Sequence, residues 1–198
     1  MRKFESLSDL PTAAQLRRLL NRKRYKKIFA ATLWNTARSV MVAGAAAVLI
    51  SALLLPVIRV TGTSMEPAVS GGQIVLCNKM QDAKRGDIIA LYYNKKILLK
   101  RVIAVAGDVI ELDSSGNVLL NGEALSEPYL KAAALGECDI EFPYTVKENR
   151  WFVMGDNRAV SVDSRVSAFG CVSDENILGV VRLRIYPFDQ PHLLGESS

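Results

Sequence analysis

Residues 39–58 form a run of twenty residues without a charged side chain, bounded by Arg38 and Arg59. As an α-helix rising ~1.5 Å per residue, this run would cross the hydrocarbon core of a lipid bilayer. A core helix of this length in a soluble protein would carry a polar stripe, and this run carries none. A cleaved signal peptide would have a shorter apolar region near the N-terminus, whereas residues 1–38 precede this one. We therefore expect an uncleaved transmembrane anchor at 39–58.

The basic residues of the chain gather on the N-terminal side of this anchor. Residues 1–38 hold ten Lys and Arg but only two acidic residues, whereas the whole chain has a formal net charge of +5. Because positively charged flanks stay in the cytoplasm, we expect 1–38 to be cytoplasmic and residues 60–198 to lie outside the plasma membrane. The lipid bilayer is then a partner. A nucleic-acid-binding arm is the alternative, but a positive block beside an apolar run indicates no nucleic-acid partner.

Apolar residues recur at helical spacing within residues 8–36, and Asp9 could cap such a helix with Pro11 in its first turn. The segment is then either an amphipathic helix on the inner leaflet or a tail that only fixes the topology. The sequence leaves both interpretations open.

Residues 59–187 have the pattern of a mostly β domain. Short apolar runs rich in β-branched residues alternate with Gly, Pro and Asn turn signals about every 8–12 residues. We expect antiparallel β-sheet here and a loosely ordered tail at 188–198, whereas the mixed sequence at 123–149 does not let its elements be placed. The expected strands are 73–78, 87–93, 96–106, 109–112, 118–120, 151–154 and 177–186.

The three cysteines, Cys77, Cys138 and Cys171, show none of the Cys and His spacings of a zinc site. We expect no metal and no cofactor. The odd count leaves two states open, which are one disulfide with a free thiol or three reduced thiols.

One serine stands out because Ser64 lies between the flexible Gly62 and the turn-forming Pro67, just after the expected anchor. The only histidine, His192, lies in the tail without a rigid setting, which argues against a Ser-His-Asp triad. A lysine can act as the base instead when burial lowers its pKa, and Lys100 lies within an apolar run.

Strand alternation places Lys100 and Arg101 on opposite faces of the strand expected at 96–106. From this pattern alone, a solvated Lys-Arg pair on an exposed strand is the favoured interpretation, and a buried base is the alternative. A polar cluster at 155–165 follows the strand expected at 151–154 and could order a site, although polar surface loops are common.

Three segments taken together resemble bacterial type I signal peptidases, in the short Gram-positive-like form with one anchor. Thr61–Pro67 resembles the nucleophile box of that family, Leu98–Asp108 its lysine box, and Met154–Arg165 its C-terminal box. Gly86-Asp87-Ile88-Ile89 matches the strand start usually found between the first two boxes. Order and spacing agree over residues 39–186.

The resemblance implies a Ser/Lys serine endopeptidase. Ser64 would attack the scissile carbonyl and form an acyl-enzyme, with the buried, neutral Lys100 as general base. Ser161 would orient the Lys100 amine. Four further residues would shape the loop, with Asp163 and Arg165 as an ion pair and Asp156 and Arg158 in support. The substrates would be signal peptides of exported preproteins, cut after small residues beside the export machinery, and bound by strand addition against residues 61–64 and the strand before Lys100.

Two positions depart from the family pattern. Some members add a side-chain oxyanion donor two residues before the nucleophile, where this chain has Gly62, so the Ser64 N–H and other backbone groups would serve. Ala159-Val160 stand where polar residues are usual. The short stretch 109–148 implies only a small non-catalytic β subdomain.

Two other interpretations remain. One is a soluble Ser/Lys autoprotease of the repressor-cleaving type, against which the 39–58 run argues. The other is a non-catalytic, membrane-anchored β domain that binds secreted partners.

Overall fold

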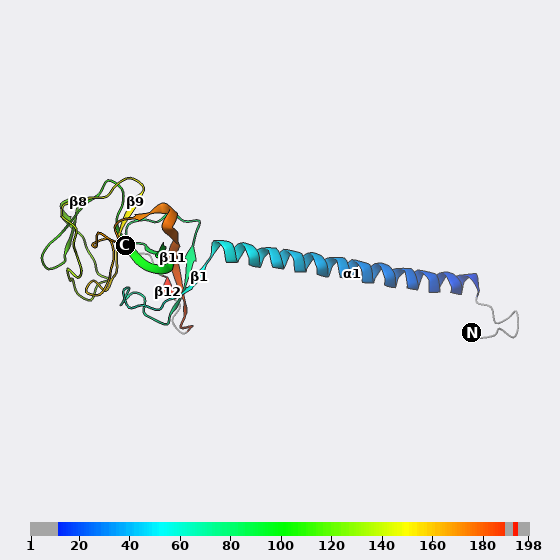
Figure 1. Cartoon of the computed structure of the whole chain (residues 1–198). Helices are drawn as coiled ribbons and strands as arrows, with labels where there is room; N and C mark the ends of the chain where they lie inside the picture. The colour runs from blue at the N-terminus through cyan, green and yellow to red at the C-terminus, as the bar shows by residue number, and fades with distance from the viewer. Residues whose placement is uncertain (1–11, 189–191, 194–198) are drawn as a thin grey trace. The chain divides into compact units, whose positions relative to one another are not determined.

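The computed structural model describes residues 12–188 and 192–193 (Figure 1). The chain divides into two compact units, Met1–Ile50 and Ser51–Ser198. The second unit holds all the strands and all the candidate site residues.

Helix α1 (Ala13–Leu54) runs without a break through the basic segment and most of the expected anchor. At its start, Gln15 Oε1 accepts the Thr12 N–H at 3.0 Å, which satisfies an otherwise free backbone donor. The helix ends four residues before the expected end of the anchor. The reason is Pro56, which lacks an N–H and disfavours helical geometry at the residue before it.

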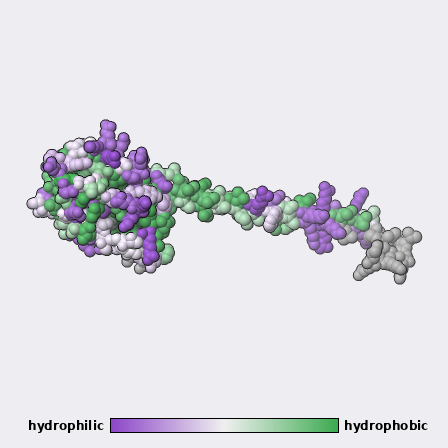
Figure 2. Space-filling view, in the orientation of Figure 1, coloured by the Kyte–Doolittle hydropathy of each residue, from purple (hydrophilic) through white to green (hydrophobic). Residues whose placement is uncertain are grey.

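Hydrophilic side chains gather along the first part of α1 and hydrophobic ones along its last part (Figure 2). By length and composition this helix could cross a membrane. The seven basic residues between Arg17 and Lys27 include consecutive ones, which a rotation of about 100° per residue turns to different sides of the helix. This distribution disfavours the amphipathic alternative. Asp9 and Pro11, the expected cap and first-turn proline, lie outside the described residues.

The main sheet confirms the expected mostly β fold class, because all its strand pairs are antiparallel. The strand order is β1-β2-β11-β3-β4-β9-β10, and β12 pairs with β11 off this path. The strands are β1 (Val57–Arg59), β2 (Ile74–Asn78), β3 (Ile88–Tyr93), β4 (Lys96–Ala104), β9 (Arg150–Met154), β10 (Val172–Ser173), β11 (Ile177–Tyr186) and β12 (His192–Leu193). A 3₁₀ turn, Asp174–Asn176, leads into β11.

A second, smaller sheet lies within the stretch 109–148, where a small subdomain was expected. Its strand order is β7-β6-β5-β8. The strands are β5 (Val109–Leu112), β6 (Val118–Leu120), β7 (Glu123–Ala124) and β8 (Tyr144–Thr145). Between β7 and β8 the chain has no regular element.

Strand β4 is buried on both faces, and this decides the environment of the candidate lysine. Leu99, Val102 and Ile103 each belong to a different cluster of buried apolar side chains. The residues from Leu99 to Ala104 are all buried as a result.

The tail is partly regular, because β12 pairs with Leu183 and Arg184 of β11. All three cysteines are free thiols. Of the two states left open by the sequence, the structure therefore has three reduced thiols.

Candidate active site

Lys100 is buried at the centre of the main sheet, with 3% of its surface exposed. Burial lowers its pKa from 10.5 to about 8, because the interior disfavours the charged amine. The carboxylate of Asp163 opposes this shift, and the guanidinium of Arg165 adds to it. A lysine with this pKa is partly neutral near physiological pH and can accept a proton.

The interpretation of Lys100 and Arg101 as a solvated pair is wrong, because both faces of β4 are covered. Arg101 is 5% exposed and donates from Nε and Nη2 to the two oxygens of Asp156, at 2.8 and 2.6 Å. Its guanidinium also lies 3.9 Å from the centre of the Tyr129 ring. The two hydrogen bonds of this buried ion pair replace the hydrogen bonds to water that an exposed arginine would make.

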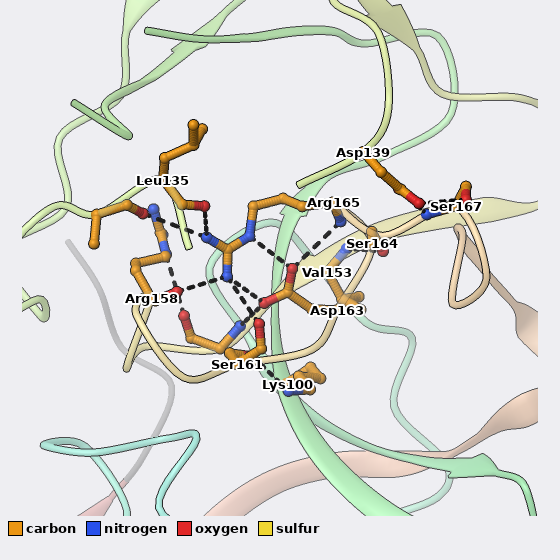
Figure 3. A network of polar contacts seen from close by, with 12 residues as sticks. Lys100, Leu135, Asp139, Val153, Arg158, Ser161, Asp163, Ser164, Arg165 and Ser167 are labelled. Carbon is orange, nitrogen blue, oxygen red and sulfur yellow. Dashed lines mark hydrogen bonds and ion pairs between the residues drawn. The ribbon is translucent and has the colours of Figure 1, made fainter. Parts of the chain in front are cut away.

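Ser161 lies in the loop that follows β9, and its hydroxyl contacts the amine of Lys100 (Figure 3). Lys100 Nζ donates to Ser161 Oγ at 2.6 Å, and Ser161 is 1% exposed. The Ser161 N–H in turn donates to Asn157 O at 3.1 Å. The hydroxyl is therefore fixed by its own loop, residues 155–167, which we call the catalytic loop.

An ion pair within the catalytic loop sets its shape. Arg165 and Asp163 are both fully buried, and Arg165 donates from Nε and Nη2 to the two Asp163 oxygens at 2.8 and 2.9 Å. Arg165 Nη2 also donates to the carbonyls of Arg158 and Ser161, at 3.0 and 3.2 Å (Figure 3). Burial alone would raise the pKa of Asp163, but the bonds and charge of Arg165 outweigh it and hold this pKa below its usual value. The pair therefore stays ionised and ties both ends of the loop together.

Ser64 lies in a turn, which we call the nucleophile turn because Ser64 is the candidate nucleophile. Backbone carbonyls of this turn accept hydrogen bonds from the catalytic loop. The Asn157 N–H donates to Ser64 O at 3.0 Å, and the Asn157 side-chain amide donates to Thr63 O at 3.3 Å. Ser64 itself is only partly buried and lines a groove on the surface.

Gly155 is the point where the Ser64 turn meets the partner of Lys100. A Cβ at Gly155 would lie 2.3 Å from Ser161 Oγ and 2.5 Å from Ser64 O. Both atoms are therefore neighbours of the same backbone position, and only glycine leaves room for them. This contact brings the nucleophile turn against the hydroxyl that orients the lysine.

The other two predicted supporting residues, Asp156 and Arg158, do not pair with each other. Asp156 pairs with Arg101, and Arg158 pairs with Glu127. Burial raises the pKa of Asp156, and the two bonds from Arg101 oppose that shift. The structure thus brings the predicted site residues together around β4 and the catalytic loop. These residues are Gly62, Ser64, Lys100, Asp156, Arg158, Ser161, Asp163 and Arg165.

Four contacting residues had no role in the sequence interpretation. Gly155 and Asn157 lay within the polar cluster at 155–165, but nothing in the pattern marked their close approach to the nucleophile turn. Arg101 was expected in solvent. Glu127 lies in the stretch 123–149, where the sequence did not let secondary-structure elements be placed. Nothing in the sequence therefore indicated that Glu127 pairs with Arg158.

A groove of about 120 Å³ lies beside Ser64. Residues 58–62, with Ser64 and Met65, form one wall, and Ile97–Leu99 forms the other. Within the described residues, β1 pairs only with β2, and Ile97–Leu99 pairs only with β3 because β9 joins β4 from Arg101 onward. The groove therefore has unpaired strand edges available on both walls.

Comparison with known proteins agrees with this arrangement. The family model "Signal peptidase, peptidase S26" matches residues 33–186. Signal peptidase I of Bacillus licheniformis is 32% identical over 172 residues, which cover 80% of this chain and 91% of that protein. Signal peptidase I S of Bacillus subtilis is 31% identical over 166 residues, which cover 78% and 89% of the two chains.

A solved structure of a signal peptidase I from Enterococcus faecalis is also similar. It is 31% identical, covers 50% of this chain and 97% of its own, and superposes with a TM-score of 0.41. The family match includes the Ser64 turn, β4 and the catalytic loop, and the Bacillus relatives cover most of the chain. The chain therefore belongs to the signal peptidase family, peptidase S26.

Proposed function

We propose that Ser64 is the nucleophile and Lys100 the general base with which this chain cleaves signal peptides from secreted preproteins. The observation that carries the assignment is the Lys100 amine, which is almost completely buried and bonded at 2.6 Å to Ser161 Oγ. Burial brings its pKa to about 8, close to the operating pH, where a general base is most effective.

The reaction then proceeds through an acyl-enzyme. Ser64 Oγ attacks the scissile carbonyl carbon while its proton passes to Lys100 Nζ. The tetrahedral intermediate collapses as the C–N bond breaks, and the protonated Lys100 gives its proton to the leaving amine. Lys100, again neutral, takes a proton from water as the water oxygen attacks the ester carbonyl. The C–O bond to Ser64 then breaks, and Lys100 returns the proton to Ser64 Oγ, which frees the serine.

The oxyanion would be stabilised mainly by backbone N–H groups. Within the described residues the Ser64 N–H donates to no other group, so it is available for a substrate oxyanion. Gly62 offers no side-chain donor, and a Cβ there would meet nothing within 4 Å. Charge stabilisation at this site therefore depends on a small number of backbone donors.

The groove beside Ser64 supports binding of the signal peptide as an added strand. Its two walls have unpaired backbone edges, which can hydrogen-bond an extended peptide between them. Apolar side chains of both walls, among them Ile97–Leu99, line this groove and can contact the small residues that precede the scissile bond.

We also propose the topology that this reaction needs. Residues 1–38 lie in the cytoplasm, the apolar part of α1 from residue 39 to its end at Leu54 anchors the chain in the plasma membrane, and the β domain from β1 to residue 187 acts outside it. The charge asymmetry across α1 supports this orientation. The peptidase would then meet preproteins where they leave the export machinery.

The test is cleavage of a purified preprotein by the full chain in detergent micelles. We expect Ser64→Ala and Lys100→Ala each to lose activity by at least about 1,000-fold, because each removes a reacting group. Lys96→Ala is the matched control, since Lys96 is exposed on the same strand. Full activity of either site variant would show that a different group performs the reaction.

A further inference from the structure

Arg158 carries a positive charge into the interior beside the backbone of Gly155. Its side chain is completely buried, and that of Glu127 is 8% exposed. Glu127 meets the guanidinium through both carboxylate oxygens, with Arg158 Nη1 donating to Oε2 at 3.1 Å and Nη2 donating to Oε1. Glu127 is therefore the ion-pair partner that permits this charge to be buried.

Arg158 connects Glu127 to the nucleophile turn. Arg158 Nε donates to Gly155 O at 3.1 Å. Gly155 is in turn the position at which Ser64 O and Ser161 Oγ approach the same backbone. A shift of Arg158 would therefore displace the backbone of Gly155, where the nucleophile turn meets Ser161.

Tyr129 links the same carboxylate to the strand of the general base. The Tyr129 hydroxyl donates to Glu127 Oε1 at 2.7 Å, and its ring lies against the guanidinium of Arg101. Arg101 follows Lys100 directly on β4. Glu127 and Tyr129 thus fix the catalytic loop and β4 from one side.

The same segment of chain is attached to the catalytic loop at its other end. Arg165 Nη1 donates to Leu135 O, and the Asp139 N–H donates to Arg165 O at 3.1 Å (Figure 3). Asp139 also accepts the Ser167 hydroxyl at 2.7 Å. Gly136 has φ +62°, and a Cβ there would lie 2.3 Å from Arg158 O.

We propose that residues 125–139 are a strap that positions the catalytic loop for the Ser64–Lys100 reaction, with Glu127 as its principal positioning residue. This inference rests on the proposed function. The strap belongs to the small subdomain at 109–148, which was expected to be non-catalytic. In this proposal the subdomain has a role in catalysis, because it holds the catalytic loop in position. Glu127 touches neither substrate nor the reacting atoms and acts through Arg158 and Gly155.

The first variant is Glu127→Gln, which keeps the size of the side chain. The amide has one oxygen where Arg158 and Tyr129 need two, and it leaves the buried Arg158 charge uncompensated. We expect kcat for a preprotein peptide to fall about tenfold with KM changed less than about twofold, because the groove is not part of the strap.

The matched control is Glu123→Gln, since Glu123 is exposed on β7 and has no ion-pair partner within the described chain. It should leave kcat unchanged. If Glu127→Gln does not fold, Tyr129→Phe decides, because it removes only the hydroxyl that holds Glu127. We expect it to lower kcat about threefold with KM unchanged.

The proposal would be overturned if a folded Glu127→Gln lowered only the thermal stability and left kcat at the wild-type value. A rise in KM with kcat unchanged would also overturn it, because the strap would then serve substrate binding. Failure of the proposed function would look different, since Ser64→Ala would then cleave as well as the wild type.

Discussion

The pH dependence of cleavage is the sharpest consequence of the Lys100 environment. With a pKa of about 8, the neutral fraction of Lys100 is about one-tenth at pH 7 and about nine-tenths at pH 9. Because only the neutral amine accepts the Ser64 proton, kcat/KM should rise about tenfold over these two pH units and then level off. A lysine at the ordinary value of 10.5 would instead give about a hundredfold rise over the same range and no plateau below pH 10.

The assay is initial-rate cleavage of a peptide that spans a signal-peptide junction and has no group titrating between pH 6 and 10. The full chain in detergent micelles is used at substrate concentrations well below KM, so that the profile reports the free enzyme. Ser64→Ala supplies the background rate at each pH. Lys100→His should not restore the wild-type rate, because the shorter imidazole would not reach the same partners.

Two outcomes would refute this reasoning. A rate that is flat from pH 6 to 10 would mean that no lysine of shifted pKa limits the reaction. A rate that keeps rising beyond pH 10 would mean that Lys100 remains as hydrated as an ordinary surface lysine, in conflict with its burial.

Three further predictions concern stability and local geometry. The lowered pKa of Lys100 means that the unfolded chain binds more protons between pH 8 and 10.5, so the wild type should gain about 3 kcal/mol of unfolding free energy across this window. Lys100→Met should lack that gain in urea unfolding, and parallel pH curves for the two proteins would contradict it. Gly155→Ala should lower kcat at least about 100-fold, because its methyl group would displace Ser64 or Ser161, and wild-type activity in this variant would refute the close approach. Gly62→Ser should raise kcat about tenfold by adding an oxyanion donor in open space, whereas Gly62→Ala should not, and an equal effect of both would exclude this explanation.

The strands of the body could be predicted where they are long enough to show a pattern. The expected strands at 73–78, 87–93 and 177–186 lie within one residue of β2, β3 and β11. The three-residue β6 was expected because turn signals flank it, whereas β1 and β12 carry too little alternation to be recognised. β1 was also hidden at the end of the apolar run, where only Leu55 and Pro56 separate strand from helix.

The resemblance anticipated the bond between Lys100 and Ser161 and the ion pair of Asp163 with Arg165, but it did not give the partners of Asp156 and Arg158. The resemblance pointed to Lys100 as a buried base, although the local pattern favoured solvent, because strand alternation cannot reveal that both faces of β4 are covered. Glu127 could not have been paired with Arg158 from the sequence, since the two lie 31 residues apart and in different parts of the fold. Long-range ion pairs of this kind leave no periodic signal in a single sequence.

The unpaired edges of the groove also set a condition on timing. A peptide can complete the sheet only while its own backbone N–H and C=O groups are free, so the junction must be presented as extended chain. A precursor that folds its mature domain up to the junction withdraws those groups into its own structure. Processing would then compete kinetically with folding of the cargo, and a few unstructured residues after the junction, at ~3.3 Å each, would decide which one happens first.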